Sequence, residues 1–239
     1  MPEITTVGFD ADDTLWHNER FFAITQDRFA ELLVDYAGRE HLDERLLAAE
    51  YRNLGRYGYG IKAFLLTMVE TAIEVTDAKL PASVIRQILE IGHDMLEHPI
   101  ELLPHARTAV EEVAGTRRAI LVTKGDLLDQ ERKLAQSGLG DLFAGVEIVS
   151  EKTPQVYARI FDERGDGAAR SIMVGNSVKS DVLPALAAGA HAAHVPFDLK
   201  WALEHAEHPE PQPRFHELDD LGGLPALLER LDDGTRSSV

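Results

Sequence analysis

The chain has 239 residues, of which 44% are hydrophobic and none is cysteine, so it can fill a buried core but can form neither disulfides nor thiolate metal sites. Its formal net charge of -17 argues against binding to nucleic acid or to an anionic membrane, because such contacts need clustered lysine and arginine. The first residues lack a basic region followed by an apolar run, and no apolar stretch has the length of a membrane span, so we expect a cytoplasmic protein.

The first predicted element is a buried strand that ends in acidic residues. Residues 4–9 are mostly apolar or β-branched, as is typical of a strand in the interior of a sheet. Asp10, Asp12 and Asp13 follow at once, which breaks this pattern within a single residue. The strand therefore delivers carboxylates to one point of the fold.

The next eighty or so residues are predicted to be helical. Apolar residues recur at the three- and four-residue spacing of packed amphipathic helices within four stretches: 21–36, 42–51, 61–73 and 84–96. Between two of these helices, the glycines and aromatic residues of Arg56–Gly60 suit either a loop that lies over a pocket or a plain helix connection. The sequence does not decide between the two.

From Pro104 onward, short apolar runs alternate with amphipathic helices, which predicts a parallel sheet with crossover helices and so an α/β, doubly wound fold. The predicted strands are 119–122, 146–149, 171–174 and 190–195. The predicted helices are 106–113, 127–136, 156–161, 182–188 and 224–231. Pro209, Pro211 and Pro213 mark a surface connection, and residues 232–239 are predicted to form a frayed tail.

Polar side chains follow four of the predicted strands. Asp10 and Asp12 follow the first, Thr123-Lys124-Gly125 the second, Lys152 the third, and the segment from Gly175 to Asp181 the fourth. Taken alone, each is typical of a turn or a helix cap. Because ligands of open parallel sheets bind outside the carboxyl ends of the strands, the four ends together predict one site.

These motifs resemble those of the haloacid dehalogenase superfamily of phosphohydrolases. The matching residues are Asp10-Ala11-Asp12-Asp13-Thr14, Thr123, Lys152 and the segment from Gly175 to Asp181, in the order that the family has them. The resemblance implies a Rossmann-like catalytic core formed by residues 1–15 and 104–239, with an inserted helical cap domain over residues 16–103.

The chemistry of phosphoryl transfer assigns a role to each candidate residue. Asp10 is the predicted nucleophile that forms an aspartyl-phosphate, and Asp12 is the predicted general acid and then general base. Thr123, with the adjoining Lys124 and Gly125, is expected to hold phosphate oxygens. Lys152 is expected to neutralise both the phosphate and Asp10.

A divalent cation is expected because an attacking carboxylate and a phosphate dianion repel each other, and Mg²⁺ suits oxygen ligands. The resemblance implies that the Asp10 carboxylate, the backbone carbonyl of Asp12 and the fourth motif supply these ligands. Here the sequence departs from the family, because Asn176 occupies the position that is commonly acidic and Asp181 is the acid of that loop. The sequence leaves open whether Asp181 binds the metal directly or through water.

The predicted activity is therefore Mg²⁺-dependent hydrolysis of a small phosphomonoester. The expected partner is a small phosphorylated metabolite, with no nucleic acid and no membrane, and the expected assembly is a monomer or homodimer. A 2-haloacid dehalogenase or a phosphomutase of the same superfamily remains an alternative, although a dehalogenase has no need of Asp12 as an acid. A non-catalytic receiver-like or phosphate-binding protein is the alternative from another class.

Two further groups of residues are assigned no catalytic role. Asp13 is expected to accept hydrogen bonds in the turn after the first strand. His191 with His194, and His205 with His208, have spacings that could bind zinc, but the sequence identifies no third ligand. We expect these histidines to lie at helix caps or on the surface.

Overall fold

The computed structural model describes residues 4–199 and 201–236, which form two compact units. One unit contains the chain up to His17, the segment Ile100–Lys124 and the residues from Arg132 onward. The other contains Asn18–Pro99 and Gly125–Glu131. The sequence predicts an insert over 16–103, whereas the chain changes unit after His17 and again before Ile100.

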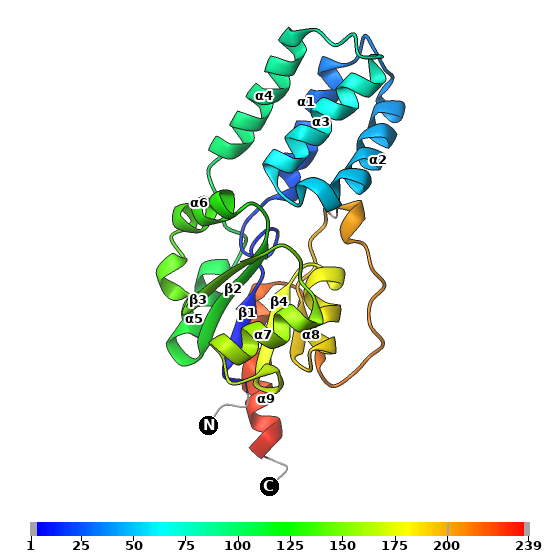
Figure 1. Ribbon diagram of the computed structural model, residues 1–239. Helices are drawn as coiled ribbons and strands as arrows, with labels where there is room; N and C mark the ends of the chain where they lie inside the picture. The colour runs from blue at the N-terminus through cyan, green and yellow to red at the C-terminus, as the bar shows by residue number, and fades with distance from the viewer. Residues whose placement is uncertain (1–3, 200, 237–239) are drawn as a thin grey trace. The chain divides into compact units, whose positions relative to one another are not determined.

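The first unit is built on a six-stranded sheet in the order β3-β2-β1-β4-β5-β6, in which every neighbouring pair is parallel (Figure 1). The strands are β1 (Thr6–Phe9), β2 (Arg118–Lys124), β3 (Gly145–Val149), β4 (Ser171–Gly175), β5 (His191–His194) and β6 (Phe215–Glu217). The chain runs outward from β1 to β3 and then returns to β4, on the other side of β1. This reversal makes the sheet doubly wound, which confirms the predicted α/β fold class.

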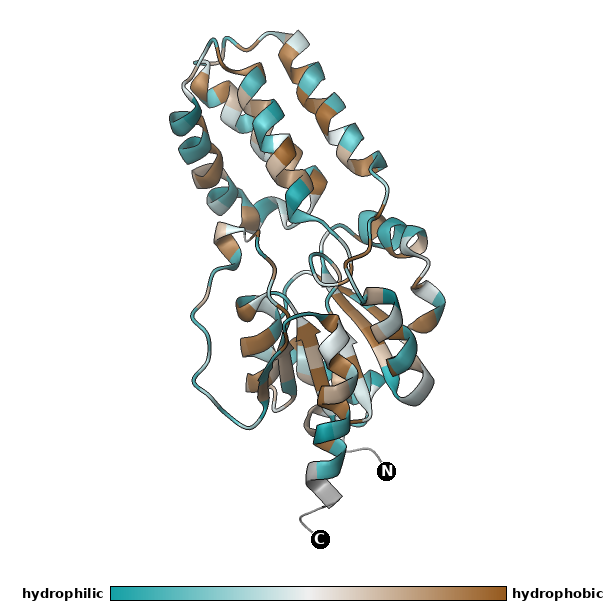
Figure 2. Cartoon of the chain, turned by 180° about the vertical axis from the view of Figure 1, so that it is seen from behind, coloured by the Kyte–Doolittle hydropathy of each residue, from teal (hydrophilic) through white to brown (hydrophobic). Residues whose placement is uncertain are grey.

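Helices cover both faces of the sheet because alternate strand residues point to opposite sides. In β2, Ala119 and Leu121 pack in a core with α5 (Ala106–Thr116) and α9 (Leu224–Arg236). Ile120 and Val122 pack in a second core with α7 (Pro154–Arg164) and α8 (Leu183–Ala187). In Figure 2 the strands are largely brown, as expected for a sheet that is buried on both faces.

Three elements of this unit differ from the sequence prediction. β6 was not predicted, because three partly exposed residues at the edge of a sheet leave no hydrophobic pattern. The predicted helix 182–188 is split into a π-helical turn, Val178–Val182, and α8. The predicted frayed tail 232–239 is wrong as far as Arg236, where α9 ends, and the rest of it lies outside the described residues.

The second unit contains the four helices α1 (Glu19–Leu32), α2 (Arg39–Tyr57), α3 (Ile61–Val75) and α4 (Ala82–Glu97), together with the start of α6 (Leu127–Ser137). The first four enclose an apolar core of their own. Its buried residues include Phe29, Leu42, Leu46, Phe64, Met68, Ile88 and Met95. The predicted amphipathic stripes are therefore packing surfaces. No helix in the described part of the chain has the length and apolar character needed to cross a membrane.

The segment Arg56–Gly60 is only partly a loop. Arg56 and Tyr57 belong to the last turn of α2, and the Tyr57 hydroxyl donates a hydrogen bond to Glu70 on α3 at 2.5 Å. Gly58 and Gly60 have φ angles of 72° and 101°, which residues with a Cβ atom rarely adopt. The glycines therefore serve a tight connection between α2 and α3, and Tyr57 ties the two helices together.

Candidate active site

The candidate site lies at the carboxyl ends of the central strands. Asp10 directly follows β1, and Asn176 directly follows β4, which is the neighbour of β1 in the sheet. The Asp10 amide donates to the carbonyl of Val174 at 2.9 Å, which extends the pairing of the two strands to their ends. The strand order of the sheet reverses between these two strands, and such switch points are where doubly wound sheets bind their ligands.

Lys152 links carboxylates that come from two other strand ends. Its Nζ donates to Asp10 Oδ1 at 2.5 Å and to Asp181 Oδ1 at 2.6 Å, and all three side chains are buried. Lys152 stands just before α7, where the Thr153 hydroxyl caps the helix by accepting from the Val156 amide. The structure thus brings together three predicted site residues that are up to 171 positions apart in the sequence.

Burial and charge oppose each other in this cluster. The pKa of Asp10 is raised to about 7, chiefly by burial and also by the Asp181 and Asp12 carboxylates, although Lys152 lowers it. Burial alone would lower the pKa of Lys152, but the Asp10 and Asp181 carboxylates outweigh it and raise that pKa above its usual value. One ammonium therefore faces two carboxylates, and the excess negative charge favours a cation.

The oxygen atoms of Asp10 and Asn176 converge on the hydroxyl of Thr14. Thr14 Oγ1 lies 3.1 Å from Asp10 Oδ2 and 3.3 Å from Asn176 Oδ1, and it accepts from the Asn176 amide at 3.1 Å. Two predicted metal ligands are thus joined through one buried side chain. The sequence prediction included Thr14 in the first motif but gave it no role in the site.

Asp181 is fixed by contacts to both of its carboxylate oxygens. Oδ1 accepts from Lys152 and, at 3.4 Å, from the hydroxyl of Tyr157, while Oδ2 accepts from the Ser177 amide at 3.0 Å. Burial raises the pKa of Tyr157 well above its usual value, so the phenol is protonated and donates. The sequence prediction missed Tyr157, whose place on α7 is that of an ordinary apolar core residue.

The donor set of this cluster fits Mg²⁺ better than a softer metal. Asp10, Asp181 and Asn176 offer only oxygen atoms, which are the ligands that Mg²⁺ prefers. Metal binding by the backbone carbonyl of Asp12 stays a prediction from the family resemblance.

Gly175 makes room for the Asp181 carboxylate, and we expect Gly175→Ala to displace it. A Cβ atom at Gly175 would lie 2.2 Å from Asp181 Oδ2 and 2.4 Å from its Cγ, far inside van der Waals contact. We expect a loss of activity of about 100-fold, because misplacing one reacting or ligating group by about 1 Å costs that much. The Mg²⁺ concentration that gives half-maximal activity should rise in the same variant.

Gly115→Ala is the matched control, since a Cβ at Gly115 on α5 would meet nothing within 4 Å. It should retain wild-type activity. A Gly175→Ala variant as active as Gly115→Ala would contradict the position of Asp181 in the site.

Two other side chains hold the carboxylate of Asp12. Trp16 Nε1 donates to Asp12 Oδ1 at 2.8 Å, and Lys133 Nζ lies 3.1 and 3.2 Å from its two carboxylate oxygens. Trp16 and Lys133 are buried. The sequence prediction missed Lys133, because a lysine within an amphipathic helix usually lies on the solvent face. Asp13 has a φ of 59°, which agrees with its predicted place in a turn.

Lys133→Met is expected to lower kcat for an alkyl phosphate by about 10- to 100-fold, because Asp12 loses the group that holds both of its oxygens. The methionine keeps most of the buried volume, so the melting temperature should change little. Gln136→Met on the exposed face of α6 is the control. An unchanged kcat in Lys133→Met would contradict the role of Lys133 in holding Asp12.

Thr123 and Lys124 lie within β2, because this strand runs two residues further than predicted. The Thr123 hydroxyl is buried and donates to the carbonyl of Lys124 at 3.3 Å. Lys124 Nζ donates to Glu204 at 2.7 Å and to Ser180 at 2.8 Å. Gly125 belongs to the helical unit. Phosphate binding by these three residues stays a prediction.

Glu204 is a further charged residue near the fourth motif that the sequence prediction missed. Its Oε2 accepts from Ser177 at 2.6 Å and from Ser180 at 2.5 Å. Burial raises its pKa, but Lys124 and the two hydroxyls outweigh burial and lower that pKa below its usual value. An ionised Glu204 therefore fixes both serines of the loop between Asn176 and Asp181.

Comparisons with known proteins identify the family and the fold of this chain. A family model described as haloacid dehalogenase-like hydrolase matches residues 4–189. A solved structure of a haloacid dehalogenase-like family hydrolase from Xanthomonas campestris is 41% identical, with a TM-score of 0.88, and the match covers 100% of this chain and 96% of that chain. No match was found among curated proteins.

Two more distant structures show the same fold. YfnB from Bacillus subtilis, which is assigned to the same class of hydrolases and was solved bound to magnesium, is 17% identical over 94% of this chain and 98% of that chain, with a TM-score of 0.67. A 2-haloacid dehalogenase from Pseudomonas syringae is 20% identical over 95% of this chain and 99% of that chain, with a TM-score of 0.65.

Proposed function

The chain belongs to the haloacid dehalogenase-like hydrolases, and on that premise we propose that it cleaves a small phosphomonoester through an aspartyl-phosphate formed on Asp10. Magnesium is the metal that this family generally uses, and we propose that this chain uses it too. The helical unit is proposed to act as the cap that selects the substrate, which we expect to be a small phosphorylated metabolite.

In the proposed first step, the Asp10 carboxylate attacks phosphorus. A bond forms between an Asp10 oxygen and phosphorus, the ester bond between phosphorus and the leaving oxygen breaks, and the leaving oxygen takes its proton from Asp12. Lys152, which already contacts Asp10 Oδ1, neutralises charge beside the nucleophile. Asp10, Asn176 and Asp181 would hold Mg²⁺, which supplies further positive charge that lets a carboxylate approach a phosphate.

In the second step, water attacks the phosphorus of the aspartyl-phosphate and regenerates Asp10. The Asp12 carboxylate takes a proton from this water, which restores its starting state. Trp16 and Lys133 hold Asp12 in one orientation for both steps.

The position of Asp12 is the observation that carries the proposal. Its carboxylate is held by Trp16 and Lys133, whereas the Asp10 carboxylate is held by Lys152. Dehalogenation at carbon expels a halide, which needs no proton, so an anchored acid at this place favours a phosphate ester. A phosphomutase would use the same first step, with a sugar hydroxyl in place of water. Family membership favours an enzyme over a receiver-like or phosphate-binding module.

The test is a screen of phosphomonoesters with Mg²⁺ and with EDTA, alongside 2-haloacids. We expect release of inorganic phosphate from at least one phosphomonoester, dependent on Mg²⁺, and no release of halide. Halide release that EDTA does not affect would favour the dehalogenase. Conversion of a sugar phosphate to its isomer without release of phosphate would favour the mutase.

A further inference from the structure

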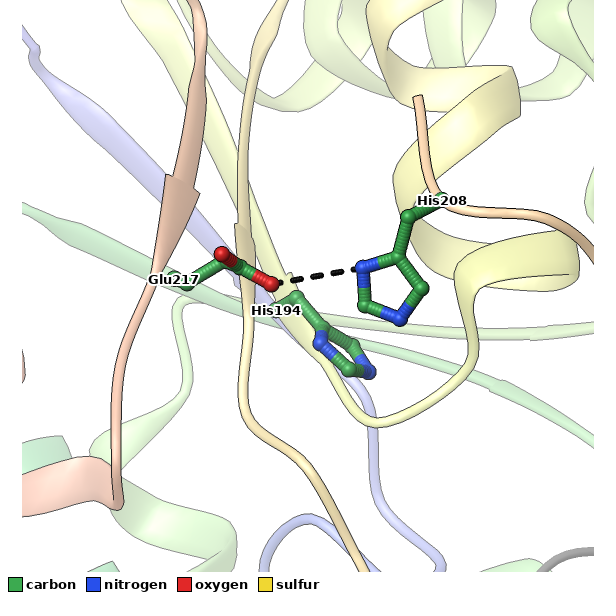
Figure 3. Close-up of side chains that lie close together, drawn as sticks. All are labelled: His194, His208 and Glu217. Carbon is green, nitrogen blue, oxygen red and sulfur yellow. Dashed lines mark ion pairs between the residues drawn. The ribbon is translucent and has the colours of Figure 1, made fainter. Parts of the chain in front are cut away.

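Three potential metal ligands from separate segments meet at the edge of the sheet. They are His194 at the end of β5, Glu217 at the end of β6, and His208 in the connection between these strands (Figure 3). The sequence paired each histidine with a neighbour in the chain and offered no third ligand. In the structure, Glu217 is the third ligand, because β6 places it in register with His194.

The spacing of these side chains suits a tetrahedral metal ion. Their candidate ligand atoms all lie within 4.8 Å of one another. The distance from His208 Nδ1 to Glu217 Oε1 is 3.3 Å. Zinc bonds of about 2.0–2.1 Å correspond to a tetrahedral edge of about 3.4 Å, so this pair already has the right separation. His208 and Glu217 are exposed, and rotation of their side chains can close the remaining gap to His194.

The buried histidine is oriented as metal-binding histidines usually are. His194 Nε2 lies 3.0 Å from the carbonyl oxygen of Asn176. A carbonyl can only accept, so Nε2 carries a hydrogen, and in the neutral imidazole the lone pair is then on Nδ1. Histidines that bind metals through one nitrogen commonly donate from the other to a carbonyl, which fixes the ring. Figure 3 shows Glu217 and His208 facing each other, with the ring of His194 beside them.

We propose that His194, His208 and Glu217 bind one divalent transition-metal ion of the Zn²⁺ class, with water at the remaining position. Two imidazoles and one carboxylate suit Zn²⁺, Co²⁺ or Ni²⁺. Mg²⁺ prefers oxygen ligands alone, so it does not compete well here. The site is thereby chemically distinct from the oxygen-only cluster around Asp10.

An ion at this site would fasten the connection between β5 and β6 to the sheet. The same connection carries Glu204, which accepts from Ser177 and Ser180 in the loop before Asp181. His194 contacts this loop as well, at the carbonyl of Asn176. The metal would therefore stabilise a segment that supports the active-site loop without contacting a substrate.

The proposal is tested by titrating the full-length protein with Zn²⁺ in saturating Mg²⁺, using calorimetry. We expect one equivalent to bind, and we expect His208→Ala and Glu217→Gln each to weaken binding by at least about tenfold. The wild-type melting temperature should rise by about 5 °C when free Zn²⁺ is 100 times its Kd. Co²⁺ in place of Zn²⁺ should give the visible absorption of a four-coordinate nitrogen and oxygen site, and His208→Ala should lose it.

His205→Ala is the matched control, because His205 is an exposed histidine of the same connection. It should bind Zn²⁺ as the wild type does. Circular dichroism of all three variants shows whether each is folded, and both ligand variants replace exposed side chains. The absence of stoichiometric binding would overturn the proposal. So would binding that His208→Ala and Glu217→Gln leave unchanged, including binding that is lost only in Asp10→Asn.

Discussion

Asp10→Asn is expected to lower kcat for phosphomonoester hydrolysis by at least about 10⁴-fold, the scale of losses when a catalytic nucleophile is removed. An amide cannot attack phosphorus to form the aspartyl-phosphate, and it ligates a cation with less charge. Lys152 keeps its contact with Asp181 in this variant, so its ammonium is not left without a counter-charge. The fold should therefore survive, with a far-ultraviolet circular dichroism spectrum like that of the wild type.

Asp162→Asn is the control for this variant, because Asp162 is an exposed aspartate on α7 of the same unit. Its activity should equal that of the wild type. If Asp10→Asn hydrolyses the best substrate of the screen as fast as Asp162→Asn does, then Asp10 is not the nucleophile.

Asp12→Asn is expected to lower kcat by about 10²- to 10⁴-fold, which is the usual contribution of general acid–base catalysis. The loss should depend on the leaving group. A nitrophenolate departs without a proton, so the first step on an aryl phosphate should survive and give a burst of nitrophenol. The second step needs Asp12 as a base and should stay slow. For an alkyl phosphate both steps should fail.

Asp13→Asn is the matched control, since the neighbouring Asp13 has a left-handed backbone that asparagine also tolerates. It should retain most activity, with no burst. Equal losses on aryl and alkyl phosphates in Asp12→Asn, with no burst on the aryl phosphate, would contradict the acid–base role of Asp12.

The sequence was sufficient to predict the parts of the molecule that have a local pattern. Five of the six strands were predicted because each is an apolar run between turn residues. The acids of the first motif stand where such a run ends. Since parallel strands end at one edge of the sheet, the order of motifs was enough to predict that Asp10, Lys152 and Asp181 would meet, as they do.

The residues that the sequence prediction missed are those whose partners are distant in the chain. Lys133 resembles an exposed helical lysine until α6 places it against Asp12. Tyr157 resembles an apolar core residue until its hydroxyl reaches Asp181. Glu217 lies on a three-residue edge strand that has no hydrophobic alternation, so its register with His194 could not be foreseen. A sequence pattern describes spacing along one element, whereas these contacts depend on how elements pack.

From the sequence alone, Asp181 could bind the metal either directly or through water. The structure shows how the Asp181 carboxylate is held in one position. Lys152, Ser177 and Tyr157 surround its carboxylate, and Gly175 leaves space for it. The Mg²⁺ dependence of Gly175→Ala measures the contribution of this carboxylate.

The covalent state of Asp10 tests the central claim most directly. Asp12→Asn should be mixed with an aryl phosphate and Mg²⁺, quenched in acid, digested and analysed by mass spectrometry. We predict one phosphoryl group on the peptide that contains Asp10, and none when Mg²⁺ is replaced by EDTA. An unmodified Asp10 peptide during the nitrophenol burst, or a carbon ester on Asp10 after incubation with a 2-haloacid, would contradict phosphoryl transfer through Asp10.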